Sequence, residues 1–269
     1  MRRFERRDWL IILGLTLAAA TLRFWNLGYP PTIIFDETYF AKFAYDYLTN
    51  TPLFDAEPPL AKYVIALGEY LFRSNPYENL NAFGWRFMPA LFGTAVIPLM
   101  YALAKRLFGG VVVPTLAAVF ALLDGLLLVE SRTALIDIFA VFFNLLTYLL
   151  FLLSLQARDK ARSIVFLTLA GISLGLGLAV KWITLAFIGT AIVILFVLYF
   201  ANAPPVKKLF RNRSGKALFD MIGARRENLH HPLLYLLLLG VLPGALYVGI
   251  FATHVPFDKY SGQGIWGIH

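Results

Sequence analysis

Long apolar runs alternate with short charged segments along almost the whole chain. Seven of these runs are long enough, or nearly long enough, to cross a hydrocarbon layer about 30 Å thick as a helix. They lie at Trp9–Leu27, Arg86–Ala104, Val111–Val129, Leu135–Leu155, Ile164–Val180, Trp182–Phe200 and Pro232–Ala252. The pattern therefore predicts an all-α polytopic membrane protein with about seven transmembrane helices.

Composition narrows the class further. The chain is 59% hydrophobic with a mean hydropathy of +0.69, too apolar for a soluble domain of this length. It has no cysteine, which excludes disulfides and thiolate metal sites. The net charge of +8 does not indicate nucleic-acid binding, because the basic residues lie between apolar runs, where they set topology and meet the lipid bilayer. The sequence also lacks a Walker loop, a nucleophile elbow and a dinucleotide fingerprint.

The segments between the runs predict the orientation. With a cytoplasmic amino terminus, most lysines and arginines fall on the cytoplasmic side, including a basic loop at residues 201–231. Residues 28–85 then form a large extracytoplasmic loop. Met1–Asp8 is basic like the start of a signal peptide, but no small-residue cleavage site follows the long apolar run, so we expect an uncleaved first helix. The expected location is a bacterial plasma membrane or an ER-type membrane.

The extracytoplasmic loop contains two amphipathic stretches. Apolar residues recur at helical spacing at positions 40, 43, 44 and 47, and again at positions 60, 64, 67 and 71. Each stretch follows a proline-containing segment, "YPPT" or "EPP", which suits the start of a helix. We expect two helices that lie on the membrane surface or against the bundle.

Four carboxylates are gathered in the same loop. Asp36 and Glu37 lie in "FDETYF", and Asp55 and Glu57 lie in "LFDAEPPLAK". Each could serve a helix, because aspartate is a good N-cap and the helix dipole favours an acid in the first turn. Capping and catalysis are compatible, however, and an exposed carboxylate could also deprotonate an acceptor hydroxyl. The four residues are therefore candidates for both roles.

Charged residues also lie at the outer boundary of the predicted spans, namely Arg132, Asp137 and Lys181. A charge at the centre of a membrane helix costs about 2.5–3.5 kcal/mol, so such residues usually face a cavity or a partner. Lys181 could instead extend to the interface beside Trp182, and Arg132 could form an ion pair with Glu130 or Asp137. Together with the outer carboxylates, these residues fit an anionic, lipid-linked substrate whose phosphate is held by cations.

Three motifs, in order, resemble those of the protein O-mannosyltransferases. They are "FDETYFAKFAYDYL" with "LFDAEPPLAK", then "ESRTALIDIFAVFF", then "GLAVKWITL". The resemblance runs from about Leu22 to His254 and agrees in order, spacing and predicted membrane side. It implies the C-type glycosyltransferase fold. It also implies an inverting transfer of mannose from a polyprenyl (dolichyl) phosphate to Ser or Thr of an acceptor polypeptide.

The resemblance implies roles for individual residues. Asp36 and Glu37 match the family's Asp-Glu pair, so we expect Asp36 to be the general base and Glu37 to orient the acceptor or Lys181. The expected substrate-binding residues are Arg132, Asp137, Lys181, Asp55, Glu57 and Lys62. The chemistry requires no cofactor and no metal ligand is assigned, although a divalent cation held by outer carboxylates could assist. The chain departs from the family at Glu57, where His is common.

Other interpretations stay open. The enzyme could use a non-protein acceptor such as a lipid A sugar or another glycan, or the chain could be a non-catalytic membrane subunit. A transporter would favour paired broken helices at mid-membrane, whereas the charges here cluster on one face. Family members usually continue through several more spans. We therefore expect residues 1–269 to form a single but incomplete transmembrane glycosyltransferase domain that works with a partner subunit or a C-terminal half.

Overall fold

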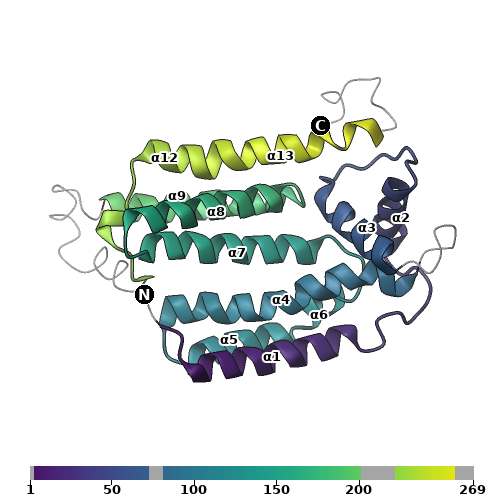
Figure 1. The fold of residues 1–269 in the computed structure, drawn as a ribbon, viewed down its shortest axis with the longest axis horizontal. Coiled ribbons are helices and arrows are strands. Elements are labelled where there is room, and N and C mark those ends of the chain that lie inside the picture. Colours follow the sequence, from purple (N-terminus) through teal and green to yellow (C-terminus); the bar gives the residue numbers. More distant parts are fainter. Residues whose placement is uncertain (1–2, 73–80, 201–221, 258–269) are drawn as a thin grey trace.

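The computed structural model describes residues 3–72, 81–200 and 222–257, and these are helical with no β-strand among them. The all-α prediction is confirmed. The long helices run side by side in a bundle, and two shorter helices cover one end of it (Figure 1). The predicted basic loop at 201–231 lies largely outside the described residues.

The helices coincide with the predicted spans and with both predicted amphipathic stretches. They are α1 (Arg6–Phe24), α2 (Glu37–Leu48), α3 (Leu60–Phe72), α4 (Ala82–Phe108), α5 (Val112–Leu123), α6 (Gly125–Glu130), α7 (Asp137–Gln156), α8 (Lys160–Leu178), α9 (Ala186–Phe200), α12 (Pro232–Leu236) and α13 (Leu242–Ala252). A short 3-10 turn at Trp182–Leu185 precedes α9, and a π-helical turn at Leu237–Val241 joins α12 to α13.

Five helical segments in the described part are long and apolar enough to cross a membrane: Ala82–Phe108, Asp137–Gln156, Lys160–Leu178, Trp182–Tyr199 and Pro232–Ala252. The chain is therefore an integral membrane protein. The first predicted span is helical, but α1 carries four charged residues, Arg6, Arg7, Asp8 and Arg23. The total of seven spans stays a prediction.

The third predicted span is not one continuous helix. The helix is interrupted at Asp124, where α5 ends and α6 begins. The Asp124 carboxylate accepts a hydrogen bond of 2.7 Å from the Leu127 backbone N–H and so caps α6. An aspartate inside an apolar run thus marks a helix start, which explains why the continuous span was wrong.

Helix α4 is the central element of one half of the bundle, because it packs against α1, α3, α5 and α7. On the other side, α8 packs between α7 and α13. Close approach depends on small residues. A Cβ placed on Gly171 would lie 1.9 Å from the Leu238 carbonyl oxygen, so only glycine fits where α8 meets the π-helical turn.

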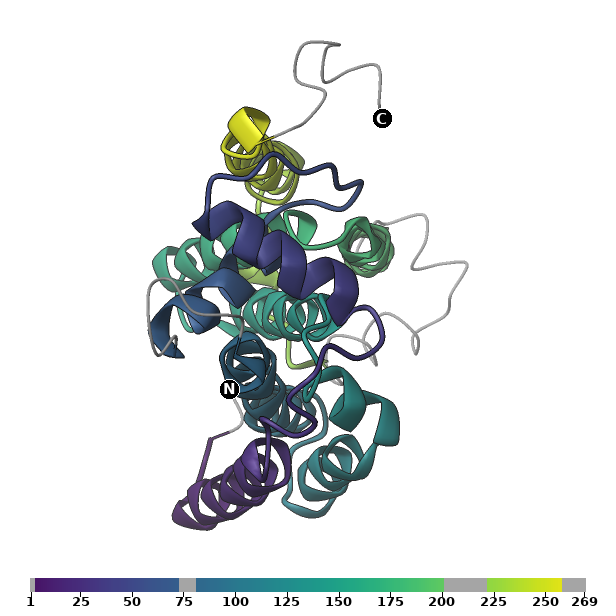
Figure 2. The same ribbon diagram turned by 90° about the vertical axis from the view of Figure 1, so that its right-hand side faces the viewer.

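Helices α2 and α3 lie across the end of the bundle, where Figure 2 views them face-on. On α3, Leu67 and Leu71 of the predicted apolar stripe are about half exposed (47% and 55%), as expected for residues that face the membrane. The face of α3 that is buried against the protein is formed by Ala61, Lys62, Ile65, Ala66, Gly68 and Glu69. A Cβ on Gly68 would lie 2.5 Å from the Gly84 carbonyl oxygen, so α3 docks on α4 by backbone contact.

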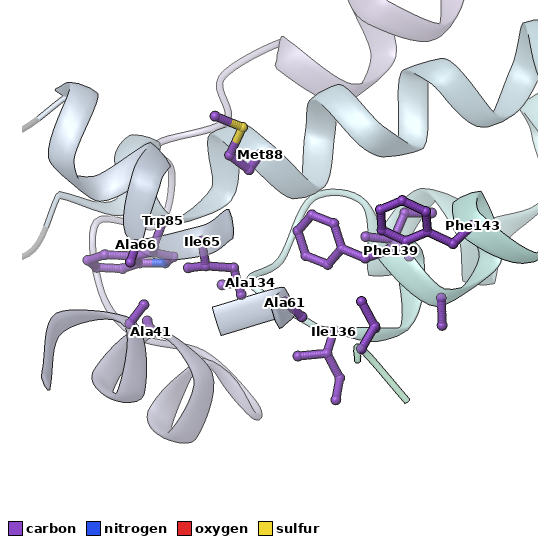
Figure 3. Close-up of a cluster of buried hydrophobic side chains, with 14 of the residues drawn as sticks. Ala41, Ala61, Ile65, Ala66, Trp85, Met88, Ala134, Ile136, Phe139 and Phe143 are labelled. Carbon is purple, nitrogen blue, oxygen red and sulfur yellow. The ribbon is translucent and has the colours of Figure 1, made fainter. Parts of the chain in front are cut away.

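A buried hydrophobic cluster fixes the two short helices to the bundle. It joins Ala41 of α2 and Ile65 of α3 to Trp85 of α4, and it continues into Ala134, which precedes α7, and Phe139 of α7 (Figure 3). The residues on which function was predicted are attached to this packed end of the bundle.

Candidate functional site

The predicted site residues gather at the end of the bundle that α2 and α3 cover. Three contacts join segments that are distant in sequence. The Ala134 backbone N–H donates to Glu37 (3.0 Å), the Leu60 N–H donates to the Ala179 carbonyl (3.0 Å), and Lys181 donates to Asp137 (2.7 Å). The three motifs of the sequence therefore meet in one region.

Asp36 occupies the N-cap position of α2, but its side chain makes no capping hydrogen bond. The residue is partly exposed, and its carboxylate has no hydrogen-bond partner among the described residues. The simple helix-cap interpretation is therefore wrong for its side chain. An accessible, unpaired carboxylate can accept a proton from a bound hydroxyl.

Glu37 is in a very different environment, because it is completely buried. Its carboxylate accepts hydrogen bonds from Arg86 Nε (2.7 Å), Arg86 Nη2 (2.8 Å) and the Ile34 backbone N–H (3.1 Å), besides that from Ala134. The prediction that Glu37 orients Lys181 is wrong, because its oxygens are bound to Arg86 and to backbone. In this structure Glu37 has no surface on which a substrate could contact it.

Arg86 is the functional-site residue that the sequence interpretation missed. It is 1% exposed, and its Nη atoms also donate to the carbonyls of Leu27 (3.2 Å), Pro30 (2.9 Å) and Thr32 (3.0 Å). The planar fork of arginine suits such simultaneous contacts. The available signal was an arginine at the start of an apolar run, because a buried cation requires a partner. The sequence did not show that this partner is Glu37, which lies 49 residues away.

Asp55 and Lys62 form a buried ion pair. Lys62 also donates to the Glu57 carbonyl (2.8 Å), and the Glu57 N–H donates to Asp55 Oδ1 (3.0 Å). Burial lowers the pKa of Lys62, and the neighbouring Asp55 charge opposes this shift. The pair thus closes the turn before Pro58–Pro59, and its side chains contact each other instead of an open surface.

Lys181 lies among carboxylates at the turn between α8 and α9. Burial alone would lower the pKa of Lys181, but its hydrogen bond to Asp137 outweighs burial and the pKa lies above its usual value. The charges of Glu57 and Glu130 act in the same direction. Lys181 and Asp137 are partly exposed (side chains 31% and 42%), so this ion pair is open to a ligand.

Arg132 is placed differently from Lys181. Its Nη atoms donate to carbonyls at the end of α1, namely those of Leu22 (2.6 Å), Arg23 (3.2 Å) and Trp25 (2.9 Å). The alternative of an ion pair with Glu130 or Asp137 is not realised among the described residues. The two cations expected at one phosphate are therefore held by different elements.

The described residues include no group of three or more His, Cys, Asp or Glu side chains that could hold a metal ion. They do form a pocket of about 450 Å³ where α2, α3 and the end of α13 meet, lined by Tyr47, Tyr63, Tyr70, Thr253 and neighbouring apolar residues. None of the predicted site residues lines that pocket.

Comparison with known proteins agrees with the motifs. A polyprenol-phosphate-mannose–protein mannosyltransferase of Mycolicibacterium smegmatis is 29% identical, over 94% of this chain and 49% of the relative. Protein O-mannosyl-transferase 1 of Danio rerio is 27% identical, over 94% of this chain and 35% of the relative. The chain therefore spans about half the length of the bacterial relative and about a third of the fish protein.

Two solved structures share the fold. The Saccharomyces cerevisiae Pmt1–Pmt2 complex bound to the sugar donor matches 97% of this chain and 36% of that chain, with a TM-score of 0.74 and 22% identity. The Archaeoglobus fulgidus oligosaccharyltransferase matches 98% and 36%, with a TM-score of 0.62 and 18% identity. The family model described as dolichyl-phosphate-mannose-protein mannosyltransferase covers residues 13–257. The predicted resemblance is confirmed, and the chain belongs to this family.

Proposed function

We propose that this chain is the N-terminal portion of a glycosyltransferase that moves mannose from a polyprenyl-phosphate-mannose donor to Ser or Thr hydroxyls of a polypeptide. The observation that carries the proposal is Asp36, an accessible carboxylate with no hydrogen-bond partner among the described residues, next to the fully buried and bonded Glu37 of the same family motif. The names of the relatives support the same donor and acceptor classes.

In the proposed reaction, Asp36 accepts the proton of the acceptor hydroxyl. The hydroxyl oxygen forms a bond to the anomeric carbon as the bond between that carbon and the phosphate oxygen breaks. Attack from the face opposite the phosphate inverts the anomeric centre. Lys181, which is partly exposed beside Asp137, offsets the negative charge that grows on the departing phosphate.

Arg132 was expected to share the phosphate with Lys181. Because the Nη atoms of Arg132 are bound to carbonyls of the α1 end, we now propose a smaller role for it. The local charge around Lys181 comes from carboxylates, namely those of Asp137, Glu57 and Glu130. The reaction as written needs no cofactor, so chelation by EDTA should leave turnover unchanged.

The proposed site faces the extracytoplasmic side of a bacterial plasma membrane or an ER-type membrane, with a cytoplasmic amino terminus. The positive-inside rule supports this orientation. Single cysteines at Thr51 and Arg158, both exposed, would lie on opposite sides. An impermeant thiol reagent added outside should label Thr51→Cys and spare Arg158→Cys, and labelling of both would contradict the orientation.

The direct test is an assay of the protein that contains this chain. Labelled polyprenyl-phosphate-mannose and a Ser/Thr-rich peptide should give a mannosylated peptide. Mass spectrometry of all acceptors in the same membranes separates this function from transfer to a lipid A sugar or another glycan. No transfer to any acceptor would favour a non-catalytic subunit.

We further propose that activity requires a partner subunit or a C-terminal half, because the chain spans about half of its bacterial relative. Residues 1–269 alone should insert in the membrane, since each helix satisfies its own backbone hydrogen bonds. They should show little transfer, because an incomplete site positions donor and acceptor poorly. Full turnover by residues 1–269 would contradict this requirement.

A further inference from the structure

We infer that Arg86 is a positioning residue for Asp36: its guanidinium fixes a strained turn that presents the Asp36 carboxylate. The inference rests on the proposed role of Asp36 as the base. Arg86 touches neither Asp36 nor the proposed path of the substrate, so it acts only through the backbone that carries Asp36.

The turn immediately before Asp36 is strained. Phe35 has φ of 50°, in the left-handed region that a bulky residue seldom adopts. Its side chain is 75% exposed, so packing of the phenyl ring does not hold this conformation. Local hydrogen bonds stabilise the turn in part. The Glu37 N–H donates to the Ile34 carbonyl (3.1 Å), and Thr38 Oγ1 donates to the Phe35 carbonyl (3.1 Å). A strained conformation persists when surrounding structure determines it.

Arg86 supplies that surrounding structure. Its guanidinium binds the carbonyls of Leu27, Pro30 and Thr32 on the amino-terminal side of the turn. The same group binds Glu37 through two nitrogens on the carboxy-terminal side. Phe35 and Asp36 therefore lie between two stretches of chain that one buried side chain holds together.

Glu37 extends this connection to the opposite side of the site. The oxygen that receives Arg86 Nε also accepts the Ala134 backbone N–H. Ala134 belongs to the segment between α6 and α7, which leads directly to Asp137 and its partner Lys181. A single charge pair thus relates the position of the proposed base to that of the proposed phosphate-binding cation.

The number of contacts explains why arginine is needed. The five N–H groups of Arg86 serve three carbonyls and two carboxylate oxygens. A lysine would keep the charge beside Glu37 but could not make this set of contacts in a plane. Arg86→Lys should therefore retain part of the function, and Arg86→Gln should retain less.

The kinetic test uses the full-length protein. Arg86→Gln should lower kcat about 100-fold with little change in the donor KM, because a displacement of about 1 Å at a catalytic group has an effect of this order. Arg86→Lys should give an intermediate kcat. If the Arg86→Gln protein does not accumulate in the membrane, kcat is compared between Arg86→Lys and the parent protein.

Lys105 provides the matched control. It lies on the same helix, α4, and forms a buried ion pair with Asp8 (2.8 Å) at the opposite end. Lys105→Gln should lower the thermal unfolding temperature as Arg86→Gln does, yet leave kcat unchanged. Equal losses of kcat in the two variants would overturn the inference, because they would show that Arg86 contributes stability alone.

A second readout does not depend on mannose transfer. The chain has no cysteine, and Leu27 is 2% exposed with its carbonyl bound to Arg86. The thiol of Leu27→Cys should resist an impermeant reagent in the parent protein and react at least tenfold faster when Arg86→Gln is added. Continued protection of this thiol would overturn the inference. If Arg86→Gln speeds labelling but the protein without this change transfers no mannose, the positioning role stands and the proposed function is refuted.

Discussion

The two ends of α4 each carry a buried ion pair, and they differ in what the pair holds. At the carboxy-terminal end of α4, Asp8 accepts from Lys105 (2.8 Å), Tyr101 (2.6 Å) and the Glu5 N–H (2.7 Å), which ties the start of α1 to α4. The pair there joins the ends of two helices.

At the amino-terminal end of α4, the pair of Arg86 with Glu37 holds an irregular loop in place. The guanidinium donates hydrogen bonds to three loop carbonyls, and the carboxylate accepts hydrogen bonds from two backbone N–H groups. Beside it lies Asp36, a carboxylate without a hydrogen-bond partner in the described residues. The comparison teaches that the same kind of buried pair can stabilise a fold or can hold one accessible acid in a fixed place.

The largest expected effect is on Asp36 itself. Asp36→Asn should lower turnover about 10²–10⁴-fold, because an amide cannot act as general base. Asp124 offers a matched control, since it is also an N-cap aspartate but caps α6. Asp124→Asn should keep near-parental turnover in the peptide assay. If Asp36→Asn also retains turnover, Asp36 is not the base and Glu57 becomes the next candidate.

Breaking either ion pair should cost similar stability. Glu37→Gln leaves Arg86 buried without its anion, and Asp8→Asn does the same to Lys105. Each change should lower the free energy of unfolding by about 3–5 kcal/mol, the usual cost of an uncompensated buried charge. Thermal unfolding in detergent measures this cost. If only Glu37→Gln also lowers kcat, the two ion pairs have different roles, as we expect. If both variants lower kcat equally, the proposed difference between the two ion pairs is contradicted.

Lys181 and Arg132 should respond differently to truncation. Lys181→Ala removes a partly exposed cation and should weaken donor binding about tenfold, the size of one charged hydrogen bond of about 1.4 kcal/mol. Arg132→Ala removes contacts to the end of α1 and should mainly lower stability. Donor titration and thermal unfolding separate the two effects. Unchanged donor affinity in Lys181→Ala would contradict its proposed role at the phosphate.

The last expected effect is a pH dependence of the stability at α3. Glu69 is buried with both oxygens unpaired in the described residues, and burial together with the nearby Asp46 charge raises its pKa from 4.5 to about 8. Because the folded pKa is the higher one, the native state retains a proton that the unfolded state releases. The stabilisation is present below pH 4.5 and is lost as pH rises to about 8.

Glu69→Gln should remove this dependence, because glutamine stays neutral. The measurement is the unfolding temperature at several pH values between 5 and 8.5, for the parent and the variant. Parallel curves for the two proteins would show that Glu69 does not titrate in this range.

Much of the fold was predictable because membrane helices satisfy their own backbone and reveal themselves by length and apolar composition. Helices α2 and α3 were also predicted, from apolar spacing after proline-containing segments. The break at Asp124 was not, because one polar residue in an apolar run can equally well face a partner. The way α3 packs on α4 was not predicted either, because the close contact uses Gly68 and Gly84, which no hydrophobic pattern indicates.

The sequence alone indicated that acids and cations gather at one end of the helices, because the charged segments between the apolar runs show which helix ends share a side. It also placed Asp36 at a helix start. Only the tertiary structure separated the two neighbouring acids of the motif, leaving Asp36 open and burying Glu37 against Arg86, 49 residues away in the chain. Adjacent residues at a helix start point in different directions, and which direction faces the core depends on elements that pack there from elsewhere. The partner of a buried charge is chosen by that packing, so local sequence could not specify it.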